Sequence, residues 1–329
     1  MSNTRPSSGK LSIFVTRRWP QAAEAALGEH FVVTLNDGDK PLSRDALIDG
    51  FASHDIAAPT VSDKIDAEIV AAGAAGKCRL ISNYGVGVNH IDLAAAAAHD
   101  IPVTNTPGVL TDATADIAMT LMLMLCRRAG EGERELRAGE WTGWRPTHLV
   151  GRALSGKTLG IIGMGRIGRA VAHRAHFGFG MDVVFQNRSQ IADGAGVGAS
   201  QLADVAAVCA ASDFVSLHCA ATVETANIMN ADAIAAMRPG GYLINTARGD
   251  VVDETALAKA LHDGVIGGAG LDVFQGEPQI NRALLSAPNT VLLPHLGSAT
   301  EETRVAMGMK VVENACAFAA GSALPDKAG

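Results

Sequence analysis

Short apolar segments alternate with segments of helical pattern along almost the whole chain. In the first 107 residues the expected strands lie at 11–16, 31–35, around Ile56, at 79–82 and at 101–105. The expected helices between them lie at 21–28, 43–51, 66–72 and 92–98. Two parallel strands need a long crossover, which is usually a helix. This order therefore predicts an α/β fold with a parallel sheet covered on both faces.

A second alternating series follows a long helix that is expected to begin near Asp112 and to end at the loop 139–156. Its expected strands lie at 158–163, 182–187, 213–218, 242–247, 267–273 and 291–295. Its expected helices start at Arg166 and lie at 201–210, 231–237 and 253–262, and a last helix follows at 301–320. A domain has roughly 100–200 residues, so the 329 residues predict two doubly wound parallel-sheet domains.

Composition argues against several classes of protein. The formal net charge is −7 and no basic block is present, so nucleic acid is not an expected partner. The longest apolar run, at 117–126, is far shorter than the about 20 residues that span a membrane. The polar N-terminus lacks the apolar core of a secretory leader. The five cysteines show no metal-ligand spacing, which predicts reduced thiols, a cytoplasmic protein and no metal site.

A glycine motif stands where an expected strand meets an expected helix. The motif GxGxxG consists of Gly163, Met164, Gly165, Arg166, Ile167 and Gly168. In a dinucleotide site the first glycine permits a tight turn, the second lets backbone approach the pyrophosphate, and the third lets helix and strand pack closely. The amides at the helix N-terminus then face the phosphates. The alternative is a glycine-rich turn in an ordinary βα unit.

The end of the next strand bears on which dinucleotide is bound. An acidic residue there accepts hydrogen bonds from the ribose of NAD, but this chain has Asn187, Arg188 and Ser189. An arginine can bind a 2′-phosphate with paired, charge-assisted hydrogen bonds, and a serine hydroxyl can add another. The triplet therefore favours NADPH, with NADH as the weaker cofactor. The alternative is that Arg188 is a solvated loop charge.

Three residues at expected strand ends have the chemistry to reduce a 2-keto acid. They are Arg248, Glu277 and His295. A fixed cation orients the substrate carboxylate and polarises the keto oxygen, and an imidazolium donates a proton to that oxygen. A carboxylate beside the imidazole favours its charged form. Each residue alone is more often structural, but the carboxyl ends of parallel strands are where such sheets bind ligands.

Five stretches resemble the D-2-hydroxyacid dehydrogenase family: NYGVGVNHID, GKTLGIIGMGRIG, MRPGGYLINTARG, GAGLDVFQGEP and LLPHLGSAT. The resemblance runs from about Tyr84 to Thr303. The resemblance implies that Arg248, Glu277 and His295 are the catalytic set and that the amides of Val86 and Gly87 receive the substrate carboxylate. It also implies four residues that border the nicotinamide, namely Thr246, Ala247, Asp272 and Gly297. It further implies a discontinuous build, with a flavodoxin-like substrate-binding domain at 1–107 and 299–329 and a Rossmann NAD(P)-binding domain at 108–298.

Within the family, GEWTGWRP and the triplet at 187–189 are similar to the NADPH-dependent glyoxylate/hydroxypyruvate reductase branch. The branch implies a homodimer in which Trp144 reaches the partner subunit's active site. The alternative is a tryptophan anchored in its own dimer interface. The sequence departs from the family at Ala220, where proline is usual, so the local shape of that loop is open.

The resulting hypothesis is an NADPH-dependent reductase of small 2-keto acids, glyoxylate and hydroxypyruvate, with hydride from the nicotinamide and His295 as proton donor. Alternatives are a 2-ketogluconate reductase or another D-2-hydroxyacid dehydrogenase. An alternative from a different class is a non-catalytic dinucleotide sensor. The short tails argue against the sensor and against a phosphoglycerate dehydrogenase with a regulatory extension.

Overall fold

The computed structural model describes residues 9–328. The described part of the chain divides into two compact units, and the first is built from two separate segments. Unit 1 comprises the described residues up to 110 and from 299 onward, and unit 2 comprises residues 111–298. The N-terminal stretch that the sequence predicts to lack a leader falls largely within residues 1–8, outside the described residues.

Unit 1 is a five-stranded parallel sheet in the order β2-β1-β3-β4-β5. Its strands are β1 (Ser12–Val15), β2 (Val32–Leu35), β3 (Ile56–Ala58), β4 (Leu80–Ser82) and β5 (Val103–Thr104). Its helices are α1 (Gln21–His30), α2 (Arg44–Ser53), α3 (Ala67–Ala75), α4 (Leu93–Ala98) and α12 (Glu301–Ala319). This strand order is the flavodoxin-like one that the resemblance implies.

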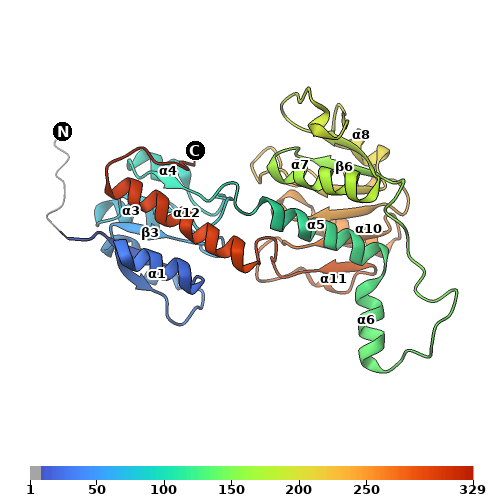
Figure 1. Ribbon diagram of the computed structural model, residues 1–329, viewed down its shortest axis with the longest axis horizontal. Helices are drawn as coiled ribbons and strands as arrows, with labels where there is room; N and C mark the ends of the chain where they lie inside the picture. Colours follow the sequence, from blue (N-terminus) through green and yellow to red (C-terminus); the bar gives the residue numbers. More distant parts are fainter. Residues whose placement is uncertain (1–8, 329) are drawn as a thin grey trace. The chain divides into compact units, whose positions relative to one another are not determined.

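Helices cover both faces of this sheet. On one face α1 packs against α12, the last helix of the chain, through Leu27 and Val311 among others (Figure 1). On the other face α2, α3 and α4 bury side chains such as Phe51 and Ile69. Every residue of β3 and β4 is buried, as expected for a parallel sheet that is apolar on both faces.

Unit 2 is a seven-stranded parallel sheet in the order β12-β11-β10-β9-β6-β7-β8. Its strands are β6 (Thr158–Ile162), β7 (Asp182–Gln186), β8 (Ser200–Gln201), β9 (Phe214–Leu217), β10 (Tyr242–Asn245), β11 (Gly268–Leu271) and β12 (Thr290–Leu292). Its α-helices are α5 (Thr111–Cys126), α6 (Ala129–Ala138), α7 (Arg166–His173), α8 (Val205–Ala211), α9 (Ala231–Ala235), α10 (Glu254–His262) and α11 (Arg282–Leu285). Its shorter helices are η1 (Arg174–Gly178), η2 (Gly194–Gly196) and η3 (Gly249–Val251).

The strand order of unit 2 places a switch point at its centre. The strand β6 pairs with β7 on one side and with β9 on the other. The chain therefore winds in opposite directions from β6, with α5 and α7 over one face and α8, α9 and α10 over the other (Figure 1). In sheets of this kind ligands bind outside the carboxyl ends of the strands at the switch point. The doubly wound fold expected from the sequence is confirmed in both units.

Two expected helices are wrong in detail. The long helix that begins at 111 ends at Cys126, because Arg128 has φ +51°, and a separate helix α6 follows. The helix expected at 201–210 begins instead at Val205, where the Asp204 carboxylate accepts a hydrogen bond from the Ala207 amide as an N-cap. Residues 200 and 201 form the edge strand β8.

Within residues 9–328, every helix is too short or too polar to cross a membrane. No group of three or more potential metal-binding side chains is found in the same residues.

Candidate active site

The glycine turn after β6 has the shape that the motif predicts. Gly163 has φ +95°, and a Cβ there would lie 2.6 Å from the Cys219 nitrogen. A Cβ at Gly168 would lie 2.3 Å from the Gly163 oxygen, so the helix packs directly on the turn. A Cβ at Gly165 would meet nothing within 4 Å. Only this middle position faces open space, as close approach to a pyrophosphate requires.

Gly165 is also the N-cap of α7, and no side chain caps that helix end. The first amides of α7 are thus available to an anion, and the helix dipole favours negative charge there. The turn and the helix end together fit the diphosphate of a nicotinamide dinucleotide.

The triplet after β7 combines one inward-facing side chain with two exposed ones. The Asn187 Oδ1 atom accepts a hydrogen bond from the Met164 amide at 3.2 Å, which ties the triplet to the glycine turn. Arg188 and Ser189 are exposed. Within residues 9–328, the Arg188 guanidinium forms no hydrogen bond or ion pair, whereas most arginines of unit 2 do.

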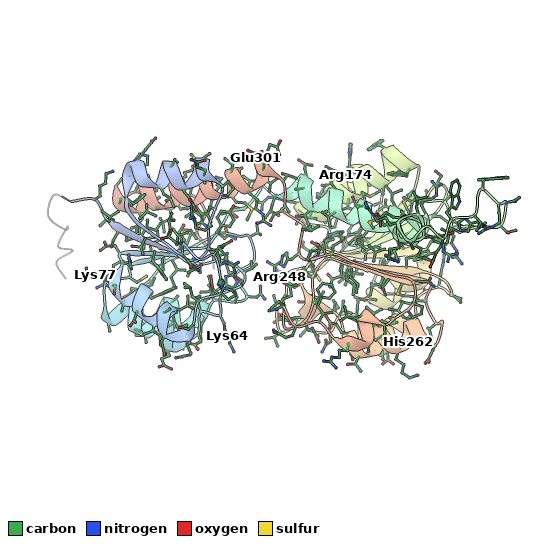
Figure 2. All side chains as sticks on the ribbon, turned by 90° about the horizontal axis from the view of Figure 1, so that it is seen from below. Lys64, Lys77, Arg174, Arg248, His262 and Glu301 are labelled. Atoms are coloured by element: carbon green, nitrogen blue, oxygen red, sulfur yellow. The ribbon has the colours of Figure 1, made fainter. Side chains whose placement is uncertain are left out.

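Arg248 follows β10 and lies at the end of the unit 2 sheet (Figure 2). The Asn245 side-chain Nδ2 atom donates to the Arg248 carbonyl at 2.8 Å, and the Arg248 Nη1 atom donates to the Ala247 carbonyl at 2.7 Å. Burial lowers the pKa of this guanidinium, and the charges of Glu277 and Asp250 oppose that effect. An arginine stays charged in proteins, so Arg248 presents a half-buried cation suited to an anionic ligand.

The loop that carries Glu277 packs tightly against the turn that carries Arg248. A Cβ at Gly249 would lie 2.0 Å from the Phe274 carbonyl carbon, so the two backbones touch. The Phe274 amide donates to the Glu277 Oε1 atom at 2.8 Å. This bond fixes the carboxylate and leaves Oε2 for another partner.

That partner is His295, whose Nδ1 atom lies 2.8 Å from Glu277 Oε2. Burial alone raises the pKa of Glu277, but the hydrogen bond and charge of His295, the Phe274 amide and Arg248 together hold this pKa below its ordinary value. An ionised carboxylate only accepts hydrogen bonds, so Nδ1 carries the proton of this pair. The Nε2 atom of His295 is then left to exchange a proton with a substrate.

The backbone around His295 is held by Asp272. His295 has φ +57°, an uncommon conformation for a residue other than glycine, and its amide donates to the Asp272 carbonyl at 2.9 Å. The Asp272 carboxylate, only 1% exposed, accepts from the amides of Leu296 and Gly297, both at 2.7 Å. Asp272 therefore acts on the backbone next to His295. Contact of Thr246, Ala247, Asp272 and Gly297 with a nicotinamide stays a prediction.

His218 is a half-buried neighbour of the site. Its Nε2 atom lies 2.8 Å from the Ser216 hydroxyl, and its Nδ1 atom lies 3.5 Å from the Thr246 hydroxyl. Burial lowers the pKa of His218 to about 3, so the imidazole is neutral at physiological pH. The sequence signal was a histidine at a strand end directly before Cys219, the residue that Gly163 abuts.

In unit 1 the loop of Val86 and Gly87 has its carbonyl groups engaged by asparagine side chains. Asn105 donates to the Val86 carbonyl at 2.8 Å, and Asn83 donates to the Gly85 and Gly87 carbonyls at 2.9 and 3.0 Å. The Oδ1 atom of Asn83 is in turn 3.0 Å from the His90 Nε2 atom. Neither asparagine was identified from the sequence, because only the fold brings them beside the loop.

Trp144 lies in an exposed arm formed by α6 and the loop that follows it. Its exposed fraction is 81% and that of Trp141 is 51%, and no residue of α6 is buried. The loop is tied to α6 by His148, whose Nε2 atom lies 2.8 Å from the Glu135 carboxylate. A single chain therefore leaves this apolar surface uncovered.

The sequence profile described as "D-isomer specific 2-hydroxyacid dehydrogenase, NAD binding domain" matches residues 119–297. The chain belongs to this family. It is therefore an oxidoreductase that binds a nicotinamide dinucleotide, and the resemblance drawn from its motifs is confirmed.

Several members of the family are similar over nearly their whole length. A glyoxylate reductase of Thermococcus litoralis is 41% identical over 321 residues, covering 96% of each chain. A glycerate dehydrogenase of Hyphomicrobium methylovorum is 40% identical over 297 residues, covering 90% of this chain and 92% of the relative. The solved structure of an NADPH-dependent glyoxylate/hydroxypyruvate reductase from Sinorhizobium meliloti, in complex with NADP and malonate, has a TM-score of 0.85 and 34% identity. The match covers 98% of this chain and 97% of that one.

Proposed function

We propose that this dehydrogenase is an NADPH-dependent reductase that converts glyoxylate and hydroxypyruvate to the corresponding 2-hydroxy acids. The observation that carries the proposal is the 2.8 Å contact between His295 and Glu277 beside the half-buried Arg248, at the end of a dinucleotide-binding sheet. Relatives named glyoxylate reductase and glycerate dehydrogenase support a small 2-keto acid as the substrate.

When bound, the cofactor supplies the hydride that is added to the substrate C2 atom. The cation of Arg248 orients the substrate carboxylate and polarises the keto oxygen. The Nε2 atom of His295 donates a proton to that oxygen, and the nearby carboxylate of Glu277 stabilises the imidazolium before the transfer. In unit 1 the amides of Val86 and Gly87 receive the substrate carboxylate.

The preference for NADPH rests on the triplet after β7. Arg188 is an exposed cation without an ion pair among the described residues, and Asn187 stands where an NAD site has a carboxylate. The reductase of Sinorhizobium meliloti, a structural neighbour, was solved with NADP. NADH is the weaker cofactor in this proposal.

We also propose a cytoplasmic homodimer. The exposed tryptophans and the absence of any buried residue in α6 support a second copy as the cover of this arm. Trp144 then contributes to the partner subunit's site. Free thiols at Cys78, Cys126 and Cys209, all buried, suit a reducing compartment.

Steady-state kinetics with a panel of 2-keto acids and both cofactors tests the proposal. Glyoxylate and hydroxypyruvate should be reduced with the highest kcat/KM, and NADPH should be preferred over NADH. Removing the Arg188 side chain should raise KM for NADPH by about 10- to 150-fold with little change in kcat, because charged hydrogen bonds contribute about 1.5–3 kcal/mol.

Two outcomes would favour the alternatives. A higher kcat/KM with 2-ketogluconate would indicate a reductase of larger sugar acids. Tight NADPH binding without turnover of any 2-keto acid would indicate a dinucleotide sensor.

A further inference from the structure

Gln201 stands beside the cofactor triplet, although fourteen residues separate it from Asn187. It ends the edge strand β8, which pairs with β7 in the register Phe185 opposite Gln201. The Leu202 amide donates to the Phe185 carbonyl at 2.8 Å and continues this pairing. The turn that leaves β7 therefore passes next to the Gln201 side chain.

Both polar atoms of the Gln201 side chain form hydrogen bonds with the backbone of that turn. Its Nε2 atom donates to the carbonyls of Asn187 at 3.0 Å and Ser189 at 3.1 Å. Its Oε1 atom accepts from the Ile191 amide at 3.0 Å. One half-buried side chain thus joins three alternate residues of a turn whose middle residues, Arg188 and Ser189, are exposed.

Asn187 determines the direction in which the Ser189 hydroxyl donates its proton. Since the Asn187 Oδ1 atom accepts from Met164, its Nδ2 group faces Ser189 and donates to the carbonyl at 3.1 Å and to Oγ at 3.0 Å. A hydroxyl has one proton, and here its oxygen already accepts a hydrogen bond. The Ser189 proton is therefore directed to a different acceptor.

The two exposed side chains of the turn then offer donors to a ligand: the Arg188 guanidinium and the Ser189 hydroxyl proton. A phosphomonoester dianion matches this set because it only accepts hydrogen bonds and carries charge opposite to that of Arg188. A ribose hydroxyl gains less from the same set, since it is neutral.

We propose that Gln201 is a positioning residue that sets the preference for a dinucleotide with a 2′-phosphomonoester. This inference rests on the proposed NADPH preference. Gln201 and Asn187 both donate hydrogen bonds to the Ser189 carbonyl. Without the Gln201 side chain, the turn is free to rotate this carbonyl away from Asn187. The Asn187–Ser189 bonds then weaken, and the hydroxyl no longer keeps its proton for the phosphate.

The test is the ratio of kcat/KM with NADPH to kcat/KM with NADH in Gln201→Leu, which has similar volume but no hydrogen-bonding groups. The ratio should fall about tenfold, through KM for NADPH and with kcat unchanged, because charged hydrogen bonds at the phosphate are weakened. Inhibition by 2′,5′-ADP should weaken by a similar factor, whereas inhibition by 5′-AMP should stay the same. Gln201→Glu, which keeps an acceptor for Ile191 but adds a negative charge, should lower the ratio further.

Asp204→Ala is the matched control. It removes the N-cap of α8 three residues away and should lower thermal stability without changing the cofactor ratio. If Gln201→Leu changes the ratio no more than Asp204→Ala does, while Arg188→Ala abolishes the preference, the role of Gln201 is overturned and the proposed function stands. If the wild-type protein prefers NADH, or Arg188→Ala leaves the ratio unchanged, the NADPH assignment itself is overturned and this inference with it. Circular dichroism of each variant checks that it is folded.

Discussion

At the scale of single residues, the proposed chemistry depends on which atoms of His295 are already hydrogen-bonded to neighbouring residues. His295 has Nδ1 committed to Glu277, and its backbone amide is committed to the Asp272 carbonyl. Only Nε2 is then left for the substrate. The motif predicts which residue types are present, whereas these hydrogen bonds define which atom of each residue acts.

Replacing His295 with alanine should nearly abolish reduction of glyoxylate. Loss of a positioned proton donor costs about 10²–10⁴-fold in rate. The Kd for NADPH, measured by fluorescence titration, should change little, because none of the contacts proposed for NADPH involves the His295 side chain. Turnover near the wild-type rate at neutral pH would show that another group donates the proton.

Glu277→Gln should lower kcat/KM for glyoxylate at neutral pH. The pKa of the Glu277 carboxyl lies below its ordinary value, so this group is ionised at neutral pH and its charge attracts a protonated His295. The uncharged amide lacks that charge and can direct an NH₂ group at Nδ1. A matched variant, Glu131→Gln, removes a carboxylate that pairs with Arg128 and should leave kcat/KM unchanged. Equal kcat/KM in wild type and Glu277→Gln would contradict the pairing.

At the scale of elements, the loops that follow β6, β7, β10, β11 and β12 carry most of the unit 2 residues that the sequence singled out. Strand ends and the glycine motif could be predicted, because short apolar runs and a GxGxxG turn are local signals. The roles of Gln201, Asn83 and Asp272 could not, because their partners are brought near only by strand pairing. Gln201 was even expected in a helix, since the apolar pattern there gave no sign of an edge strand that ends before the Asp204 cap.

Asp272→Asn should impair catalysis through the segment 295–297. In the native protein, the two Asp272 carboxylate oxygens accept hydrogen bonds from the backbone N–H groups of Leu296 and Gly297. An asparagine side chain keeps only one acceptor oxygen, and its NH₂ group faces the other backbone N–H. A buried donor left without an acceptor costs about 1–3 kcal/mol. We expect a lower melting temperature and a lower kcat/KM for glyoxylate.

The control for this substitution is Asp253→Asn at the N-cap of α10, since asparagine caps helices about as well as aspartate. Thermal melts and steady-state kinetics of both variants decide the matter. Equal kcat/KM in wild type and Asp272→Asn would show that Asp272 does not position His295 for catalysis.

At the scale of the whole molecule, the division into units could not be worked out from periodicity. The pattern shows where a helix lies at 301–319, but not that it packs on the first sheet beside α1 (Figure 1). That return followed from the resemblance to the family, whose motifs occur in both units. Family motifs thus carried long-range information that local patterns lack.

Stability against pH is a property of the whole fold, and His218 should dominate part of it. Its folded pKa of about 3 lies well below the ordinary value near 6.5, because the imidazole is buried. Below pH 6.5 the unfolded chain binds a proton that the folded protein does not bind. The free energy of unfolding should therefore be unaffected by this group above pH 6.5 and should fall by up to about 1.4 kcal/mol per pH unit below it.

His218→Gln keeps a side chain able to hydrogen-bond Ser216 but cannot titrate. The free energy of unfolding of wild type and variant is measured with urea between about pH 5 and 7.5. The difference between the two free energies should change by up to about 1.4 kcal/mol per pH unit below pH 6.5. Parallel curves for wild type and His218→Gln would mean that His218 binds its proton equally in the folded and unfolded states, and the neutral imidazole beside Thr246 would be wrong.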